Sequence, residues 1–164
     1  MATGVVSWSQ TAATNASADA NVNWAEGQAP STVNDSARSM MASVAKYRDD
    51  NAGSLTTAGS STAYTLTTNQ GFASLAAMSG QTVVFKVDET SGAAPTLNVD
   101  SLGAKALHSV GGTALPTGAL IANGIYAATY DNSNSRWVVH GMFGVLSLAS
   151  LSTTAGVTVG NGLT

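Results

Sequence analysis

The stretch WAEGQAPSTVNDSARSMM, residues 24–41, decides how the rest of the chain is organised. Ser31 is the candidate N-cap of a helix, because its hydroxyl can accept one of the amide protons that the first turn leaves unpaired. Asp35 lies in or near that first turn, where the helix dipole favours an anion. We expect a helix over residues 31–50 that stops before Gly53.

One face of this helix carries apolar residues at regular intervals. The intervals are four, three, four and three residues, which is a short heptad pattern typical of helices that pack against copies of themselves. Residues 31–50 are therefore predicted to be an oligomerising helix. The predicted seam consists of Val33, Ala37, Met40, Val44 and Tyr47.

Residues 24–41 also resemble the N-terminal segment of bacteriophage tail-fibre and related appendage proteins. In that segment a variant of W-x-E-G-Q-x-P-S-x-V-N-x-S-A-R-x-M-M precedes a helix and then β-rich modules. The resemblance covers roughly residues 1–50 and is long and ungapped. It implies a trimeric structural protein of the virion, attached through its N-terminus to another protein of the tail, baseplate or neck. It does not indicate which of these components is the partner.

Composition favours a chain that hides much of its surface in an assembly; the alternative is an extracellular β protein with a Ser/Thr-rich surface. Charged residues make up 9% of the 164 positions, whereas roughly 25% is usual for soluble domains. The net charge of −3 implies no nucleic-acid partner. Cysteine is absent, which excludes disulfides and thiolate metal sites.

The chain shows no targeting or membrane signal in its sequence. The N-terminus lacks a basic segment followed by an apolar core. No apolar run approaches the roughly 20 residues of a membrane helix, so we expect no membrane insertion. These features suit a protein that is assembled onto a virion in a bacterial host cytoplasm.

Residues 1–30 are predicted to be an extended attachment arm. Val5, Val6 and Trp8 could form a short strand, and the remainder has too few apolar residues for a core of its own. The segment is either a disordered tail or an arm that orders on a partner surface; its two tryptophans favour the arm, since aromatic residues carry much of the binding energy at interfaces. The predicted virion-docking residues are Trp8, Trp24, Glu26, Gln28 and Pro30.

The second half of the chain is predicted to be a β module. Residues 51–62 have the composition of a linker, and residues 63–142 are expected to form a β-sandwich or small barrel, because short strands alternate with turn signals. Residues 72–78 are ambiguous between a helical turn and a strand. The order of these segments also resembles, more loosely, modules found along viral fibres. The expected strands cover residues 63–67, 82–87, 96–99, 105–108, 125–130 and 136–140.

Residues 143–164 are expected to form a fibre-like β tail. Val157 and Val159 alternate with Thr158, and a glycine-rich turn follows. A single strand of this kind exposes unpaired backbone groups, so we expect three copies to wind together on a threefold axis, or the tail to lead into a longer fibre. The predicted fold class is thus mainly β and trimeric, with an arm and one helix in front and a fibre-like tail behind.

The sequence offers no convincing catalytic or metal site. His108 and His140 are isolated. Asp88 and Glu89 are adjacent in sequence, and neighbours on a strand point to opposite faces, which favours a solvated turn over a shared catalytic centre. The loop 131–135 has oxygen ligands at alternate positions, as calcium loops do, but lacks their characteristic glycine and glutamate. We therefore expect a non-enzymatic structural protein without cofactors.

The alternative class is a carbohydrate-binding module or β-sandwich adhesin. In that case Tyr126, Tyr130 and Trp137 would stack on a sugar. If the chain is a tail-fibre protein, a host surface glycan is also a candidate partner, bound through a distal region. Thermal stability and sugar binding of a Trp137 variant separate the two classes, because a core tryptophan and a binding tryptophan have opposite effects.

Overall fold

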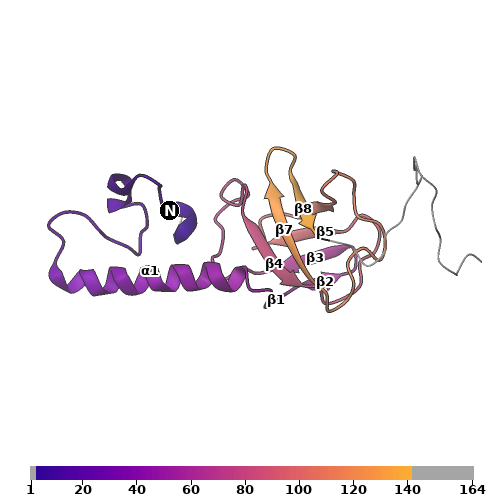
Figure 1. Cartoon of the computed structure of the whole chain (residues 1–164), viewed down its shortest axis with the longest axis horizontal. Helices are drawn as coiled ribbons and strands as arrows, with labels where there is room; N and C mark the ends of the chain where they lie inside the picture. The colour runs from indigo at the N-terminus through magenta and orange to yellow at the C-terminus, as the bar shows by residue number, and fades with distance from the viewer. Residues whose placement is uncertain (1–2, 142–164) are drawn as a thin grey trace, which may run out of the picture.

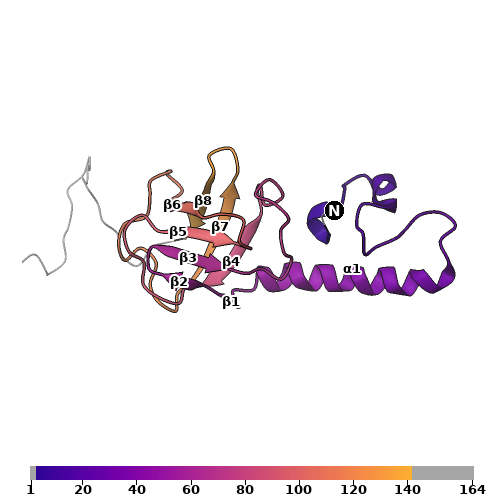
Figure 2. The same ribbon diagram turned by 180° about the vertical axis from the view of Figure 1, so that it is seen from behind.

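A computed structural model describes residues 3–141. A single long helix, α1 (Pro30–Asp50), projects from one end of a β-barrel, and the N-terminal segment lies back along one side of that helix (Figures 1 and 2). The described part of the chain is therefore elongated, with the helix start at the end far from the barrel. Within residues 3–141 no helix is both long enough and apolar enough to cross a membrane.

The helix is where the sequence predicts it, but its first turn is built differently. Pro30 occupies the first helical position after Ala29, since its fixed φ suits that site and its missing N–H is not needed there. Ser31 is therefore inside the helix, and the prediction that it is the N-cap is wrong. The hydroxyl of Thr32 instead donates to the carbonyl of Ala29 at 2.8 Å. Asp35 lies beyond the first turn and forms an ion pair with Arg38.

The β region is a single mixed sheet of eight strands that nearly closes into a barrel. Its order is β1-β4-β7-β8-β6-β5-β3-β2, with parallel pairs β1/β4, β3/β5 and β6/β8 and antiparallel pairs elsewhere. The strands are β1 (Leu55–Thr56), β2 (Ala58–Ser60), β3 (Ala63–Leu66), β4 (Thr82–Lys86), β5 (Thr96–Val99), β6 (Lys105–His108), β7 (Ile125–Asp131) and β8 (Arg136–His140).

The two outermost strands of this sheet belong to one continuous segment. β1 pairs with β4, and β2 pairs with β3. Only Thr57 separates β1 from β2, so residues 55–60 link the two ends of the sheet. Thr57 is 3% exposed, and its hydroxyl donates to a carboxylate oxygen of Asp88 at 2.5 Å. The segment 51–62, which composition indicates as a linker, thus contains the strands that bring the barrel close to closure.

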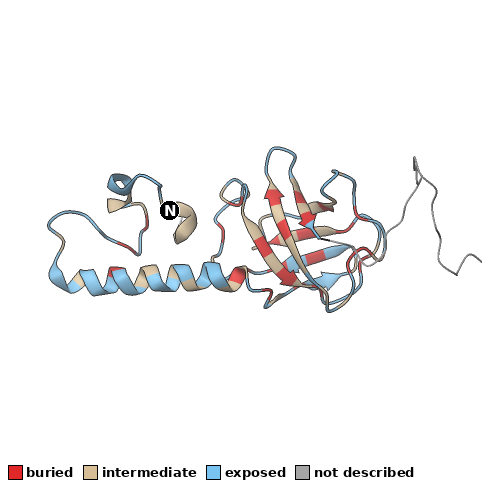
Figure 3. Cartoon of the chain, viewed as in Figure 1, coloured by how far each residue is buried: buried red, intermediate tan, exposed pale blue. Residues whose placement is uncertain are grey.

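The barrel interior is filled by side chains from alternate strand positions. Tyr64 and Leu66 on β3, and Val83 and Phe85 on β4, are each no more than 3% exposed, as the period-two alternation of these strands predicts. The barrel strands carry most of the buried hydrophobic side chains, whereas α1 is largely exposed (Figure 3). The hydrophobic core of the described residues therefore lies inside the barrel, which is filled by side chains.

Several local predictions are settled by the structure. All six predicted strands are present, and the module is a nearly closed barrel, one of the two predicted architectures. The short strand predicted near Val5 is wrong, because Val5–Ser7 is a 3-10 helix, η1. Of the two conformations expected for residues 72–78, the structure has the turn: the N–H of Met78 bonds back to the carbonyls of Ser74 and Leu75, at 3.3 and 3.1 Å, and the segment contains no strand. Phe72 and Met78 anchor it in the core. The predicted tail, residues 143–164, lies outside the described residues.

Candidate functional site

The surface most suited to interactions is formed by α1 and the N-terminal segment, residues 3–29, which we call the arm. The arm contains η1 (Val5–Ser7) and a second 3-10 helix, η2 (Ala12–Ala16). It folds back on α1, which overturns the expectation of an extended arm. A compact arm is possible because its polar backbone groups find partners within the arm and on α1.

Asp19 is the centre of the folded arm. One of its carboxylate oxygens accepts hydrogen bonds from the backbone N–H of Gly4 at 2.7 Å and from the indole N–H of Trp8 at 3.1 Å. The other accepts the N–H of Asn21 at 2.9 Å. Burial raises the pKa of Asp19, but these hydrogen bonds outweigh it and hold the pKa below its ordinary value. The carboxylate therefore ties Gly4 and Trp8 to the turn at Asn21 within the arm.

Ser36 joins the arm to the helix. Its hydroxyl accepts the backbone N–H of Asn23 at 3.0 Å and lies 3.1 Å from the carbonyl of the same residue. A second contact lies two turns further along α1, where Gly4 approaches Ser43. Small side chains at these two helix positions allow the backbone of the arm to lie close to α1.

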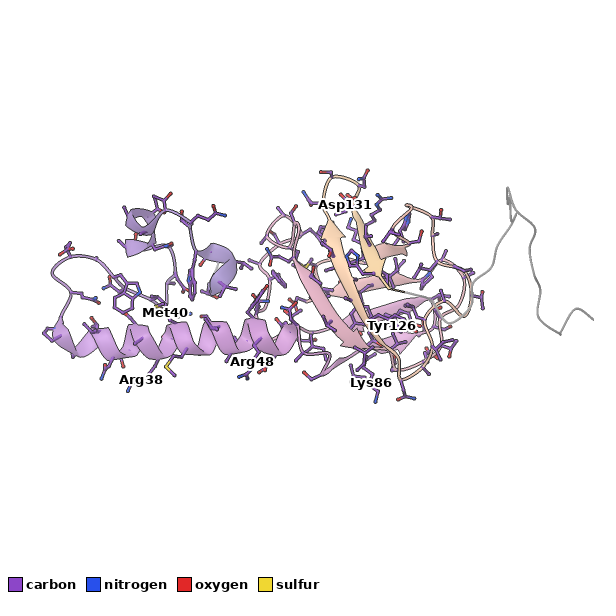
Figure 4. All side chains as sticks on the ribbon, viewed as in Figure 1. Arg38, Met40, Arg48, Lys86, Tyr126 and Asp131 are labelled. Atoms are coloured by element: carbon purple, nitrogen blue, oxygen red, sulfur yellow. The ribbon has the colours of Figure 1, made fainter. Side chains whose placement is uncertain are left out.

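The two tryptophans of the arm are held in defined positions. Trp8 is half-buried and bonded to Asp19, whereas Trp24 is 37% exposed and its indole N–H points at the sulfur of Met40 at 3.2 Å. Met40 faces the arm, and Arg38 and Arg48 point away from it (Figure 4). The arm thus presents one partly exposed indole beside the helix.

The structure brings three of the five predicted docking residues together. Trp8, Trp24 and Glu26 line one hollow of about 650 Å3, whose walls also include Asp19 and Met40. The other two lie at the start of the helix. Pro30 is its first residue, and the side-chain oxygen of Gln28 lies 3.0 Å from the hydroxyl of Thr32.

Most of the predicted oligomerisation seam is uncovered in the single chain. Val33, Val44 and Tyr47 are 42%, 51% and 44% exposed, and Ala37 is exposed as well. Met40 is half-buried because Trp24 leans against it. Met41, which the heptad pattern did not include, is 73% exposed. These residues leave a continuous apolar stripe along one side of α1.

A second hollow runs along this stripe and meets the first at Trp24 and Met40. It measures about 670 Å3 and is lined by Trp24, Ala37, Met40, Met41, Val44, Ala45 and Arg48. The arm and the seam are therefore parts of one surface, with Trp24 as the wall that they share.

The residues considered for other chemistry have structural partners. The carboxylate of Asp131 accepts hydrogen bonds from Asn134 and Arg136. His108 bonds to the carbonyl of Gly112 at 2.7 Å, and His140 to the hydroxyl of Thr129 at 2.8 Å. Among residues 3–141 no group of three or more acidic, histidine or cysteine side chains is placed to hold a metal ion.

The sugar-stacking residues of the alternative class do not form a shared surface. Tyr130 and Trp137 are each 1% exposed and pack against one another inside the barrel, with ring centroids 5.1 Å apart. Tyr126 is half-buried, and its hydroxyl accepts the N–H of Ile121 at 2.8 Å. The expected platform for a sugar is therefore absent at these three residues.

Comparisons with known proteins add no identity to this surface. No protein-family model matches the chain, and no curated protein matches its sequence significantly.

Two residues that organise the site, Asp19 and Ser36, were not predicted from the sequence. The available signal for Asp19 was that it is one of only two charged residues within positions 1–30.

Proposed function

We propose that this chain is a structural protein of a bacteriophage virion, a subunit of a trimeric tail fibre or related appendage that attaches to the particle through its N-terminal arm. The observation that carries the proposal is the exposed apolar stripe on α1. Exposed apolar residues at heptad spacing on a projecting helix favour packing against further copies of the same helix.

The position of the stripe supports self-association through α1. The helix has 21 residues and is joined to the barrel at its end, so that most of its length is accessible to other chains (Figure 1). The arm covers the flank that contains Ser36 and Ser43, and leaves Val33, Ala37 and Val44 uncovered. Two heptads are marginal by themselves, so contacts elsewhere in the assembly would have to add to the seam.

The barrel fits the role of a spacer between attachment and distal regions. Its interior is packed with side chains, among them Trp137, Tyr130 and Phe85. The number of three chains and the assignment to a virion come from the resemblance of residues 24–41. The sugar-binding class is less well supported, because two of its three stacking residues are in the core.

Mass in solution tests the seam. We expect light scattering to give three times the 16.4 kDa of one chain. Val44→Asp would place a charge in the desolvated seam, and such an uncompensated buried charge is strongly destabilising, so this variant should dissociate. Ala42→Asp is the matched control, since Ala42 is exposed on the opposite face of α1, and it should keep the parental mass.

The possible results separate the parts of the proposal. A parental protein that is monomeric at all concentrations would refute self-association through α1. A trimer that survives Val44→Asp would place the interface elsewhere. Mass spectrometry of purified particles tests the virion assignment, which fails if the chain is absent from them.

A further inference from the structure

The hollow between Trp8 and Trp24 has a chemical character that the proposed function does not explain. Its walls combine two indoles, the carboxylates of Asp19 and Glu26, and apolar side chains that include Val22 and Met40. No residue within positions 1–30 is lysine, arginine or histidine. The hollow is therefore apolar and aromatic, with negative charge only.

Asp19 keeps its charge without a cationic partner. It is 4% exposed, and its hydrogen bonds come from two backbone N–H groups and one indole. Across residues 3–141 the ion pairs are Arg38 with Asp35, Arg48 with Asp49 and Arg136 with Asp131, so none involves Asp19 or Glu26. A buried anion bonded only to neutral donors creates a negative potential that favours a cation nearby.

The tryptophans favour the same kind of ligand. Indole is the aromatic group that attracts a cation most strongly, over its face and within about 6 Å of the ring centroid. The Trp8 ring is oriented by Asp19 and the Trp24 ring by Met40, so both are positioned before a ligand arrives. Preorganisation of this kind lowers the cost of binding.

A lysine or arginine side chain fits this combination of groups. Its long apolar stem can lie against alanine, valine and methionine, while its charged head stays near the indoles and carboxylates. An anionic ligand would be repelled. The arginines of the chain's own helix, Arg38 and Arg48, point away from the arm (Figure 4), and no basic side chain among residues 3–141 lines the hollow.

We propose that the hollow between Trp8 and Trp24 binds a lysine or arginine side chain of the protein on which the arm docks. That this partner belongs to a virion rests on the proposed function, whereas the binding of a cationic side chain does not. The arm would then recognise a basic residue on its partner, with Glu26 at the open rim of the hollow.

The indole N–H signals of the protein report on this binding. The chain has three tryptophans, and Trp137 in the barrel is an internal control. The probes are Nα-acetyl-arginine amide and Nα-acetyl-lysine amide, each compared with a neutral analogue of similar shape, citrulline amide or norleucine amide. In 15N NMR titrations of the full chain we expect the Trp8 and Trp24 signals to shift and saturate with the cationic probes alone, while the Trp137 signal stays in place.

Two variants examine the groups that the proposal names. Glu26→Gln removes one exposed charge and should weaken arginine binding by about two- to fivefold. Trp24→Leu removes one ring and should weaken it by at least about threefold. Glu89→Gln is the matched control, because Glu89 is an exposed carboxylate on the barrel, and it should leave the binding unchanged.

Each contrary result overturns the proposal. Equal shifts with citrulline or norleucine would mean that the hollow is merely apolar, and no saturable shift would mean that it is not a binding site. A light-scattering mass from the same sample distinguishes this failure from failure of the proposed function. A trimer without probe binding refutes only the cation site, and a monomer that binds the cationic probes refutes only the trimer.

Discussion

Asp50 and Asn69 fasten the helix to the barrel: one carboxylate oxygen of Asp50 accepts both the backbone N–H of Asn69, at 2.7 Å, and its side-chain amide, at 2.8 Å. The other oxygen accepts the backbone and side-chain N–H groups of Gln70, at 3.1 and 3.0 Å. Asp50 is the last residue of α1 and is fully buried. The orientation of the helix against the barrel therefore depends on this carboxylate.

Asp50→Asn should lower the free energy of unfolding by on the order of 2–3 kcal/mol, since an amide offers one accepting oxygen and the charge is lost. Chemical denaturation measures this change. Asp49→Asn is the control, because Asp49 forms an exposed pair with Arg48 and such pairs contribute little. Equal stability of the two variants would contradict the role assigned to Asp50.

Trp137 supports the barrel core. It is 1% exposed, lies opposite Tyr130 in the β7/β8 pair and opposite Leu107 in the β6/β8 pair. Trp137→Ala should therefore cost about 3–5 kcal/mol, measured by thermal or chemical unfolding. Trp24→Ala, at an exposed indole, should cost much less. If Trp137→Ala left stability unchanged and removed binding on a glycan array, the sugar-binding class would replace the present proposal.

Thr57 bonds the segment that links the ends of the sheet to the turn after β4. Its hydroxyl donates to the Asp88 side chain and accepts the Asp88 N–H at 3.0 Å. Thr57→Val preserves shape and removes both bonds, which should cost about 1–2 kcal/mol. Thr56→Val is the matched control at the adjacent exposed position and should be nearly neutral. Hydrogen exchange of β1 and β2 shows whether the loss is local.

The strands were predictable because their side chains alternate between core and surface. The apolar residues at every second position of residues 83–87 predict which side of the strand faces the core. These residues, Val83, Phe85 and Val87, are all buried. The segment 55–60 carries no such alternation. Its place in the sheet comes from backbone pairing with β4 on one side and β3 on the other, and pairing between distant strands leaves little trace in local composition.

The candidate site was predictable in its parts and not in its arrangement. Spacing indicated the apolar residues that form the exposed stripe on α1, whose role as an oligomerisation seam stays a prediction. The two tryptophans of residues 1–30 favoured an ordered arm over a disordered tail. The arm folds back because of contacts between residues far apart in the sequence, such as Ser36 with Asn23 and Asp19 with Gly4. A serine inside a helix is ordinarily neutral or unfavourable for helix stability. Nothing in the sequence therefore indicated that Ser36 would hydrogen-bond the arm.

The arm should lose its internal fold in acid, because Asp19 bonds to Gly4, Trp8 and Asn21 within the arm. Burial raises the pKa of Asp19, but the hydrogen bonds from Asn21, Gly4 and Trp8 lower it by more than burial raises it. The folded arm therefore prefers the charged carboxylate. This contribution to stability is present above the ordinary carboxyl pKa of about 3.9 and is lost as the pH falls through the lowered pKa of the folded state. The indole signal of Trp8, followed from pH 7 downward, should therefore lose its native position at low pH.

Asp19→Asn isolates this effect from the other carboxylates, including Glu26 in the same hollow. The asparagine amide cannot accept at both oxygen positions, so that the Trp8 signal should be displaced already at pH 7 and its acid-dependent change should disappear. Asp35→Asn is the control, because Asp35 is exposed on α1 and pairs only with Arg38. A native Trp8 signal in Asp19→Asn at pH 7 would show that the arm is held by Ser36 and its neighbours without the carboxylate.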